Sequence, residues 1–263
     1  MPAKFTKSSL ALLLLSITIL SVQCAGLFKF KDQAKLGQSV YKQIQTSSLP
    51  WKTVARSVEN REIYLLELGD GDSTTVIFGG FHGDEIMGVQ LVFRFAEYLF
   101  FEKTNKLEAR VIIIPVLNPD GLVRAKRKNA NNVDINRNFP TKNWKPQYAS
   151  KSYYPGDAPA SEPETRAAIT ILEEYGPQRI ISVHTALAMV NYDGPGLSLA
   201  RKMAQYNKYP VEPDIGYPTP GSFGTYAGKE RNIPTITLEL KKESFEEVWQ
   251  TNREALWAAV GYE

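Results

Sequence analysis

The sequence predicts an α/β fold: a doubly wound, mostly parallel mixed sheet with helices on both faces. Short runs of branched apolar residues alternate along the chain with longer segments of helical periodicity, the pattern of strands joined by helices. The run Arg110–Leu117 is almost continuously apolar, as strands covered on both faces of a parallel sheet are. With 263 residues, 43% of them hydrophobic, the chain suits one large domain of this class.

The first half of the chain is expected to contain a helix, an edge hairpin, a buried strand, a helix with a broad apolar face and a second buried strand. The Glu59-Asn60 pair is a turn signal between the two alternating segments of the hairpin. The predicted ranges are Lys29–Thr46, Thr53–Ser57 with Glu62–Leu68, Thr75–Gly80, Ile86–Phe101 and Arg110–Leu117.

Residues 118–161 are predicted to be loop-like. The N-P-D-G segment at 118–121 must stop the preceding strand, because proline lacks a backbone donor and Asp-Gly favours a turn. A structureless segment of this length in a compact domain usually lines a functional site. Ser161 is predicted to be the N-cap of the next helix, with Glu162 and Glu164 as further capping residues.

The second half is predicted to alternate helices and strands. Gly176-Pro177 should end the first of these helices, and an amphipathic helix should close the domain. The first predicted helix follows Ser161 and ends at about Tyr175, and the other three are Leu197–Asn207, Thr225–Arg231 and Phe245–Val260. The predicted strands are Arg179–Val183 and Ile236–Leu240, and a loop is predicted at Gly216–Ser222.

The N-terminal residues 1–25 have the pattern of an export signal, and residues 26–263 are expected to form a single catalytic domain. A positive region with Lys4 and Lys7 precedes the apolar run Leu10–Val22, and small residues follow. Cys24, the only cysteine, lies where a lipoprotein signal has its acylated residue; plain cleavage nearby is the alternative. We therefore expect an exported protein of the periplasm or cell envelope, in contact with the membrane only through an anchor at Cys24.

The charge pattern argues against a nucleic-acid partner. The formal net charge is +3, and the basic cluster at residues 124–128 is too short to neutralise many phosphates. A mature chain without cysteine also excludes a disulfide framework, so core packing must supply its stability.

Four polar residues follow or end predicted strands, at the sheet edge where open α/β proteins bind ligands: His82, Asn118, His184 and Glu239. The chain has only two histidines, and Glu85 follows His82 by three residues on a strand-to-helix turn, so the two side chains can share a cation. Two histidines and a carboxylate are a hydrolytic zinc set. The alternative is a surface turn with a glutamate in the first helical turn.

Several sequence blocks, in order, resemble the zinc carboxypeptidase family, the metallopeptidases related to the pancreatic carboxypeptidases. The blocks are F-H-G-D-E (81–85), N-P-D-G (118–121), V-D-I-N-R-N-F (133–139), S-V-H-T (182–185) and T-L-E-L (237–240). The resemblance extends from the Thr53 hairpin to Val260 and implies a metallocarboxypeptidase with one Zn²⁺ per chain.

The resemblance also implies a role for each site residue. The zinc ligands would be His82, Glu85 and His184, and Glu239 would be the general base. Arg127 would polarise the scissile carbonyl, and Asn136 with Arg137 would bind the terminal carboxylate of the substrate. Tyr217 would be the mobile residue that closes over the substrate. Other readings of the same residues remain: Arg127 as a solvated cation, Asn136 and Arg137 as turn residues, and Tyr217 as a surface aromatic. Asp84 is expected beside the site, not as a ligand.

Within the family, the short chain and the blocks G-Y-P-T-P-G-S-F-G, A-S-E-P-E-T and V-N-Y-D-G-P-G look most like murein peptide amidases. These cut the bond between γ-D-glutamate and meso-diaminopimelate in peptidoglycan stem peptides, so a stem peptide is the expected substrate partner. The Phe223-Gly224 stretch offers no acidic residue of the kind that selects basic side chains in the pancreatic branch. The alternatives are a general envelope carboxypeptidase acting on L-peptides and a non-catalytic zinc-dependent peptide-binding module.

Overall fold

The computed structural model describes residues 32–261. Residues 32–46 are helical, which confirms the described part of the first predicted helix; the export signal and Cys24 lie outside the described residues. In the described part of the chain, no helix is both long and apolar enough to cross a membrane.

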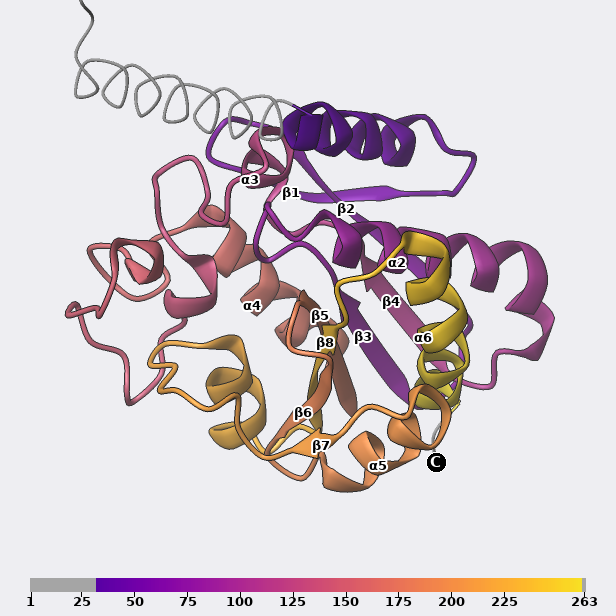
Figure 1. Ribbon diagram of the computed structural model, residues 1–263. Helices are drawn as coiled ribbons and strands as arrows, with labels where there is room; N and C mark the ends of the chain where they lie inside the picture. The colour runs from indigo at the N-terminus through magenta and orange to yellow at the C-terminus, as the bar shows by residue number, and fades with distance from the viewer. Residues whose placement is uncertain (1–31, 262–263) are drawn as a thin grey trace, which may run out of the picture.

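One mixed eight-stranded sheet forms the centre of the molecule, in the order β1-β2-β4-β3-β5-β8-β6-β7 (Figure 1). The central strands β4, β3, β5 and β8 are parallel, whereas the β1–β2, β2–β4 and β6–β8 pairs are antiparallel. The strands are β1 Lys52–Arg56, β2 Glu62–Leu68, β3 Thr74–Phe78, β4 Arg110–Ile114, β5 Arg179–Thr185, β6 Met189–Asp193, β7 Val211–Glu212 and β8 Thr235–Leu240.

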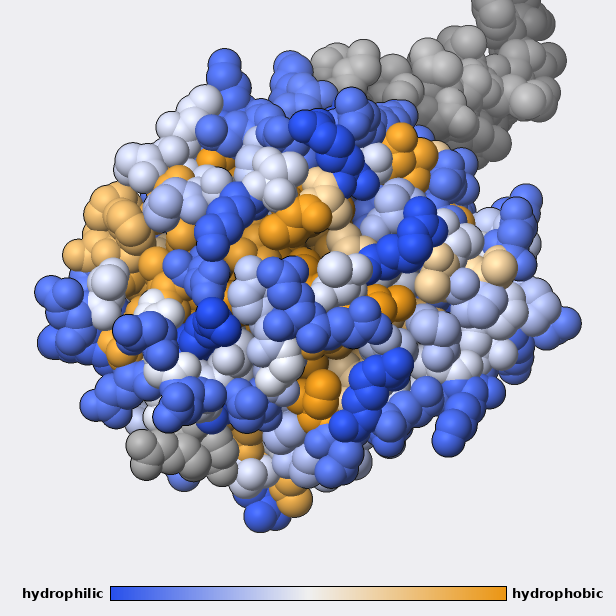
Figure 2. Space-filling view, turned by 180° about the vertical axis from the view of Figure 1, so that it is seen from behind, coloured by the Kyte–Doolittle hydropathy of each residue, from blue (hydrophilic) through white to orange (hydrophobic). Residues whose placement is uncertain are grey.

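Helices cover both faces of this sheet, as predicted. The helices α2 (Ile86–Tyr98), α5 (Leu197–Asn207) and α6 (Phe245–Val260) share one apolar core on one face with the helix at 32–46. The helix α4 (Pro163–Tyr175) packs on the opposite face with the loop residues Phe139 and Phe223. Figure 2 shows a largely hydrophilic surface from behind, with hydrophobic residues in separate patches.

The predicted turn at 118–121 is wrong. Asn118 is the N-cap of a short helix, α3 (Pro119–Arg124), and its side-chain oxygen accepts a hydrogen bond from the backbone N–H of Gly121 at 2.9 Å. Proline at the first helical position needs no donor and has a helical φ already, so N-P-D-G begins a helix here. Two 3₁₀ turns, Ile135–Arg137 and Lys151–Tyr153, further interrupt the predicted loop.

The predicted cap of α4 is also wrong in detail. Glu162 is the N-cap and makes no side-chain capping bond, while the Ser161 hydroxyl donates to Glu162 Oε1 at 2.7 Å. Glu164 is fully buried and accepts hydrogen bonds from Asn129 Nδ2 and from the backbone N–H of Val58. These long-range partners, which no local pattern reveals, replace the capping contacts.

The remaining differences concern short elements. The strands β6 and β7 were not among the predicted elements, and the predicted helix at Thr225–Arg231 is a single π-helical turn, Thr225–Lys229. The strand β6 contains polar residues at alternate positions because one of its faces lines a cavity, so its sequence lacks the apolar run of the central strands.

The asparagine at 118 joins three segments that meet at the edge of the sheet. Its Nδ2 group donates to the carbonyls of Phe81 and Arg127, each at 3.3 Å, and the side chain is completely buried. Asn118 therefore has a structural function: it fixes the turn that bears His82 and the loop that bears Arg127.

We expect Asn118→Ala to lower the free energy of unfolding by about 2 kcal/mol, because it removes a helix cap and leaves two buried carbonyls without this donor. Chemical denaturation measures this loss, with the exposed Asn105→Ala as the matched control that should change stability by less than about 0.5 kcal/mol. Equal effects of the two substitutions would contradict the structural function of Asn118.

Candidate functional site

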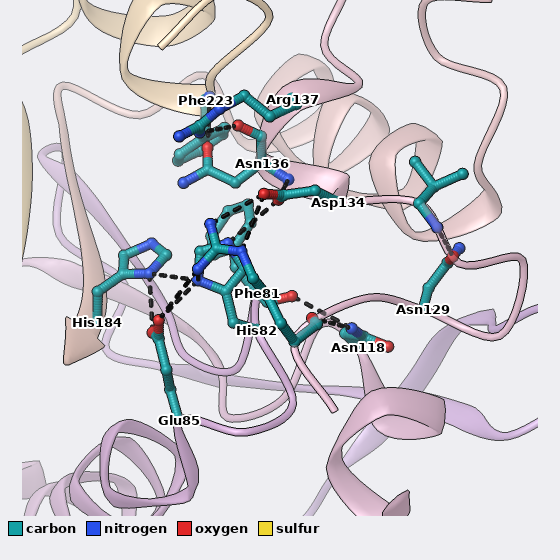
Figure 3. A network of polar contacts seen from close by, with 12 residues as sticks. Phe81, His82, Glu85, Asn118, Asn129, Asp134, Asn136, Arg137, His184 and Phe223 are labelled. Atoms are coloured by element: carbon teal, nitrogen blue, oxygen red, sulfur yellow. Dashed lines mark hydrogen bonds and ion pairs between the residues drawn. The ribbon is translucent and has the colours of Figure 1, made fainter. Parts of the chain in front are cut away.

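Three side chains converge at the carboxyl end of the parallel strands (Figure 3). His82 lies just past β3, Glu85 is the N-cap residue of α2, and His184 lies near the end of β5. Glu85 Oε1 lies 2.8 Å from His82 Nδ1, Glu85 Oε2 lies 3.0 Å from His184 Nδ1, and the two Nδ1 atoms are 3.2 Å apart. All three residues are at most 9% exposed.

The donor set fits a zinc ion. Nitrogen and oxygen ligands about 2.1 Å from a tetrahedral metal lie about 3.4 Å from one another. The two Nδ1 atoms are 3.2 Å apart, close to this separation, and one ligand atom from each of the three residues lies within 4.8 Å of the others. The two imidazoles and the carboxylate also satisfy the ligand types of a catalytic zinc site, and three protein ligands leave one position for water or substrate. Asp84 is exposed and lies outside this group, as predicted.

Asp134 orients the metal centre from behind. Its Oδ1 lies 3.2 Å from His82 Nε2, and its Oδ2 accepts hydrogen bonds from Arg127 Nε and Nη2 at 3.0 and 2.9 Å. A proton on His82 Nε2 donates to this carboxylate and leaves the Nδ1 lone pair facing Glu85 and His184. One fully buried aspartate therefore sets both the histidine tautomer and the position of Arg127.

The electrostatics of this group favour a bound cation. Burial by itself lowers the pKa of His82, but the charges of Glu85 and Asp134 outweigh it and raise that pKa to about 9. Burial raises the pKa of the Glu85 carboxyl, yet the two imidazoles hold it well below its usual range. The site thus attracts positive charge to the point at which the ring nitrogens meet.

Glu239 lies beside His184 because of the strand register. The two residues are paired neighbours on the parallel strands β5 and β8, so their side chains emerge on the same face of the sheet. Burial raises the pKa of Glu239, and its Oε2 atom is buried without a hydrogen-bond partner among residues 32–261. An acid with a free oxygen next to the metal ligands can accept and return a proton.

Arg127 points toward the same centre. Its Nη1 atom lies 3.3 Å from His82 Nδ1 and 3.8 Å from Glu85 Oε1, while the rest of the guanidinium is fixed on Asp134. The side chain is only 24% exposed, so the alternative of a solvated cation on a basic run does not describe its surroundings. A fixed N–H donor at this place can stabilise negative charge that develops on a substrate oxygen.

Asn136 and Arg137 line the cavity from the 3₁₀ turn. Asn136 Oδ1 accepts a hydrogen bond from the backbone N–H of Phe223 at 2.9 Å, which leaves its Nδ2 group as the donor available to a ligand. Arg137 is 4% exposed and forms no ion pair with another described residue. A buried guanidinium without an acidic partner is suited to bind a carboxylate that enters the cavity.

Tyr217 lies on the Gly/Pro loop at the mouth of the cavity. It is 44% exposed, and its ring stacks on Tyr153 with 6.2 Å between centroids. Tyr153 also lies under the guanidinium groups of Arg127 and Arg137, at 5.4 and 5.3 Å. Tyr153, which the sequence patterns do not single out, is therefore an aromatic support for both arginines and for Tyr217.

The predicted site residues line one cavity of about 660 Å³, together with several residues from β6 and the loop that precedes the π-helical turn. Sequence reasoning does not single out Asp134 or Asp193 in this region. The available signal is weak: Asp134 is a charged residue between the apolar Val133 and Ile135, and Asp193 is the only charged residue of V-N-Y-D-G-P-G. Phe223-Gly224 has no acidic side chain, but Asp193 brings one to the cavity from β6.

Comparisons with known proteins agree with this geometry. Residues 42–195 match the family model described as zinc carboxypeptidase. The chain is 37% identical to murein peptide amidase A of Vibrio campbellii over 188 residues, which cover 65% of this chain and 71% of that protein. It is 34% identical to murein peptide amidase A of Escherichia coli K12 over 183 residues, or 65% and 73% of the two chains.

Solved structures show the same architecture. The crystal structure of murein-tripeptide amidase from Escherichia coli O157 superposes with a TM-score of 0.70 at 27% identity, covering 82% of this chain and 94% of that one. Bovine thrombin-activatable fibrinolysis inhibitor superposes with a TM-score of 0.68 at 20% identity, with coverage of 88% and 94%, and shows the fold alone.

We expect Asp134→Asn to weaken metal binding by about 10- to 100-fold, because the amide no longer holds His82 in the required tautomer. Competition with a chromogenic chelator measures the zinc affinity of the purified protein. The exposed Asp70→Asn is the matched control and should leave that affinity unchanged. Wild-type zinc affinity in Asp134→Asn would show that His82 does not depend on this carboxylate.

Proposed function

This chain belongs to the zinc carboxypeptidase family and is a zinc-dependent hydrolase, and we propose that it cleaves the bond before a terminal residue that has a free carboxylate. The observation that supports this exopeptidase activity most directly is Arg137, which is buried in the same cavity as the metal ligands and forms no ion pair with another of residues 32–261. A planar guanidinium binds a carboxylate through two parallel hydrogen bonds, so it favours a chain end over an internal bond.

We propose the following roles for the residues around the metal. Zinc, when held by His82, Glu85 and His184, supplies a Lewis acid beside the scissile carbonyl and lowers the pKa of water. Glu239 accepts a proton from the attacking water and then donates it to the leaving amine, for which its free Oε2 is placed. Arg127 donates a hydrogen bond to the carbonyl oxygen as that oxygen gains negative charge.

The substrate is held by the opposite wall of the cavity in this proposal. Asn136 and Arg137 bind the carboxylate of the residue to be released, while Tyr217 covers it from the loop. Fixing that carboxylate orients the scissile bond relative to Glu239, and such positioning is a large part of a hydrolase's rate enhancement.

As the physiological substrate we propose the peptidoglycan stem peptide, cleaved between γ-D-glutamate and meso-diaminopimelate. Two relatives named murein peptide amidase A, from Vibrio campbellii and Escherichia coli, match about two thirds of the chain at 37% and 34% identity and support a peptidoglycan peptide as substrate. The released residue retains a free α-carboxylate, so the same Asn136 and Arg137 anchor applies to it. Export by residues 1–25, with either cleavage or acylation near Cys24, would place the enzyme in the cell envelope.

Incubation of the zinc-loaded protein with the stem tripeptide and with an ordinary L-peptide, followed by mass analysis, tests this function. We expect release of diaminopimelate from the stem peptide and a loss of about 10²- to 10⁴-fold in kcat for Glu239→Gln, with zinc content unchanged. Hydrolysis of the L-peptide alone would indicate a general carboxypeptidase. Intact peptides after long incubation would indicate a binding module.

A further inference from the structure

The far end of the catalytic cavity has a pair of opposite charges. Asp193, at the end of β6, forms an ion pair with Lys229, at the end of the π-helical turn, with 3.1 Å between Oδ1 and Nζ. Both residues line the same cavity as Glu239 and Arg137. Their side chains differ in exposure: that of Asp193 is 11% exposed and that of Lys229 is 55% exposed.

The strand register places this pair at a defined depth from the metal centre. On β8, Glu239 lies beside the metal ligands, and Thr235 lies four residues earlier, where it pairs with Asp193 of β6. Residues at alternate positions share one face of a sheet, and a strand advances about 3.3 Å per residue. Asp193 thus lies about 13 Å along the sheet from the level of Glu239.

The face between these two points is polar. Ser182, Asn191 and Thr237 occupy the alternate positions of β5, β6 and β8, and all three line the cavity. The opposite face of the same strands carries Ile181, Val190 and Leu238 in the apolar core. The cavity is therefore a polar channel over the sheet that leads from the reacting centre to Asp193.

Two glycines of the covering segment leave the space that Asp193 occupies. A Cβ atom at Gly224 would lie 2.0 Å from Asp193 Oδ2, and one at Gly228 would lie 2.4 Å from Asp193 Cβ. Any larger residue at either position would displace the aspartate, so the covering turn is shaped around this carboxylate.

We propose that Asp193 and Lys229 together recognise the side-chain end of the released residue when that end is a zwitterion, with an ammonium group and a carboxylate on the same carbon. The inference rests on the proposed function and identifies the specificity pocket of that reaction. The ammonium group takes the place of Lys229 Nζ beside Asp193, and the distal carboxylate pairs with Lys229. Because a partly exposed ion pair is weak and the lysine stem is flexible, the pair opens at little cost.

This arrangement distinguishes three classes of terminal residue. The side chain of meso-diaminopimelate satisfies both charges after a short aliphatic spacer. Lysine satisfies Asp193 and leaves Lys229 without a carboxylate. Leucine satisfies neither charge and would place an apolar side chain against the Asp193–Lys229 ion pair. A site built to pair a polar group discriminates strongly against an analogue that lacks it.

The test varies the terminal residue and the scissile linkage independently. The substrates are peptides of the form L-Ala-Glu-X, in which X is meso-diaminopimelate, meso-diaminopimelate amidated at the distal carboxylate, lysine or leucine. Each X is attached in one series by a γ-D-glutamyl bond and in a second series by an α-L-glutamyl bond. The values of kcat/KM are measured for wild type, Asp193→Asn, Lys229→Gln and the distant control Lys42→Gln. Calorimetry with the free amino acids gives a second readout that does not depend on turnover.

For wild type we expect kcat/KM of the meso-diaminopimelate peptide to be about 10-fold higher than that of the lysine peptide or of the amidated diaminopimelate peptide. It should be about 100-fold higher than that of the leucine peptide. Lys229→Gln should abolish the preference for the free distal carboxylate and leave the lysine peptide unchanged. Asp193→Asn should reduce kcat/KM by about 10- to 100-fold for the three substrates with a side-chain ammonium group and spare the leucine peptide. The binding affinities of the free amino acids should follow the same order, and Lys42→Gln should behave as wild type.

Equal losses on all four terminal residues, together with a lower melting temperature, would show that the pair is only structural and would overturn the inference. Failure of the proposed function has a different signature. In that case the γ-D-glutamyl series is not cleaved, while the order of terminal residues persists in the α-L-glutamyl series or in the binding data.

Discussion

The convergence of two imidazole nitrogens and one carboxylate on a single point is the constraint on which the rest of the structure depends. His82, Glu85 and His184 come from two neighbouring parallel strands and the helix that follows one of them. The two Nδ1 atoms are 3.2 Å apart, and each lies 2.8 or 3.0 Å from a different oxygen of Glu85. Such an arrangement is costly to bury unless a cation occupies it. The sheet makes it possible because parallel strands end at the same edge.

One face of the sheet packs in the apolar core, and the other face lines the catalytic cavity. On one face, β5, β6 and β8 contribute only apolar residues to a core with α2, α5 and α6. On the other face, the same strands present a serine, an asparagine, a threonine and Asp193 to the catalytic cavity. A strand with alternating character can do both, since successive side chains point to opposite sides.

Asp134 connects the loop region to the metal centre. It lies on the long segment between β4 and α4, is fully buried, and contacts His82 as well as Arg127. The loop is in turn fixed by buried polar contacts, such as those that Asn138 Nδ2 makes to the carbonyls of Pro155 and Ala158. A segment without long helices is thereby held rigidly enough to position Arg127, Asn136 and Arg137.

Local sequence patterns determined the parts of this protein that depend on near neighbours. The apolar runs of β3, β4, β5 and β8 and the periodicity of α2, α5 and α6 predicted the sheet and its helices, because burial on one or both faces imposes these patterns. The spacing of His82 and Glu85 on one turn, with His184 after a second strand, likewise predicted the metal-binding cluster.

Tertiary structure alone decided the contacts between segments far apart in the chain. The buried partners of Glu164, the contact of Asp134 with His82 and the approach of Asp193 to Lys229 join residues that no local pattern relates. The strand β6 escaped prediction for a related reason, because its polar residues form a cavity wall and its sequence lacks the apolar signal. The helix start at Pro119 is different, because an asparagine cap followed by proline at the first helical position is itself a local pattern. The role of a buried polar side chain depends on the hydrogen-bond or ion-pair partner that the fold brings to it. An apolar side chain needs only burial, and local periodicity is enough to predict that.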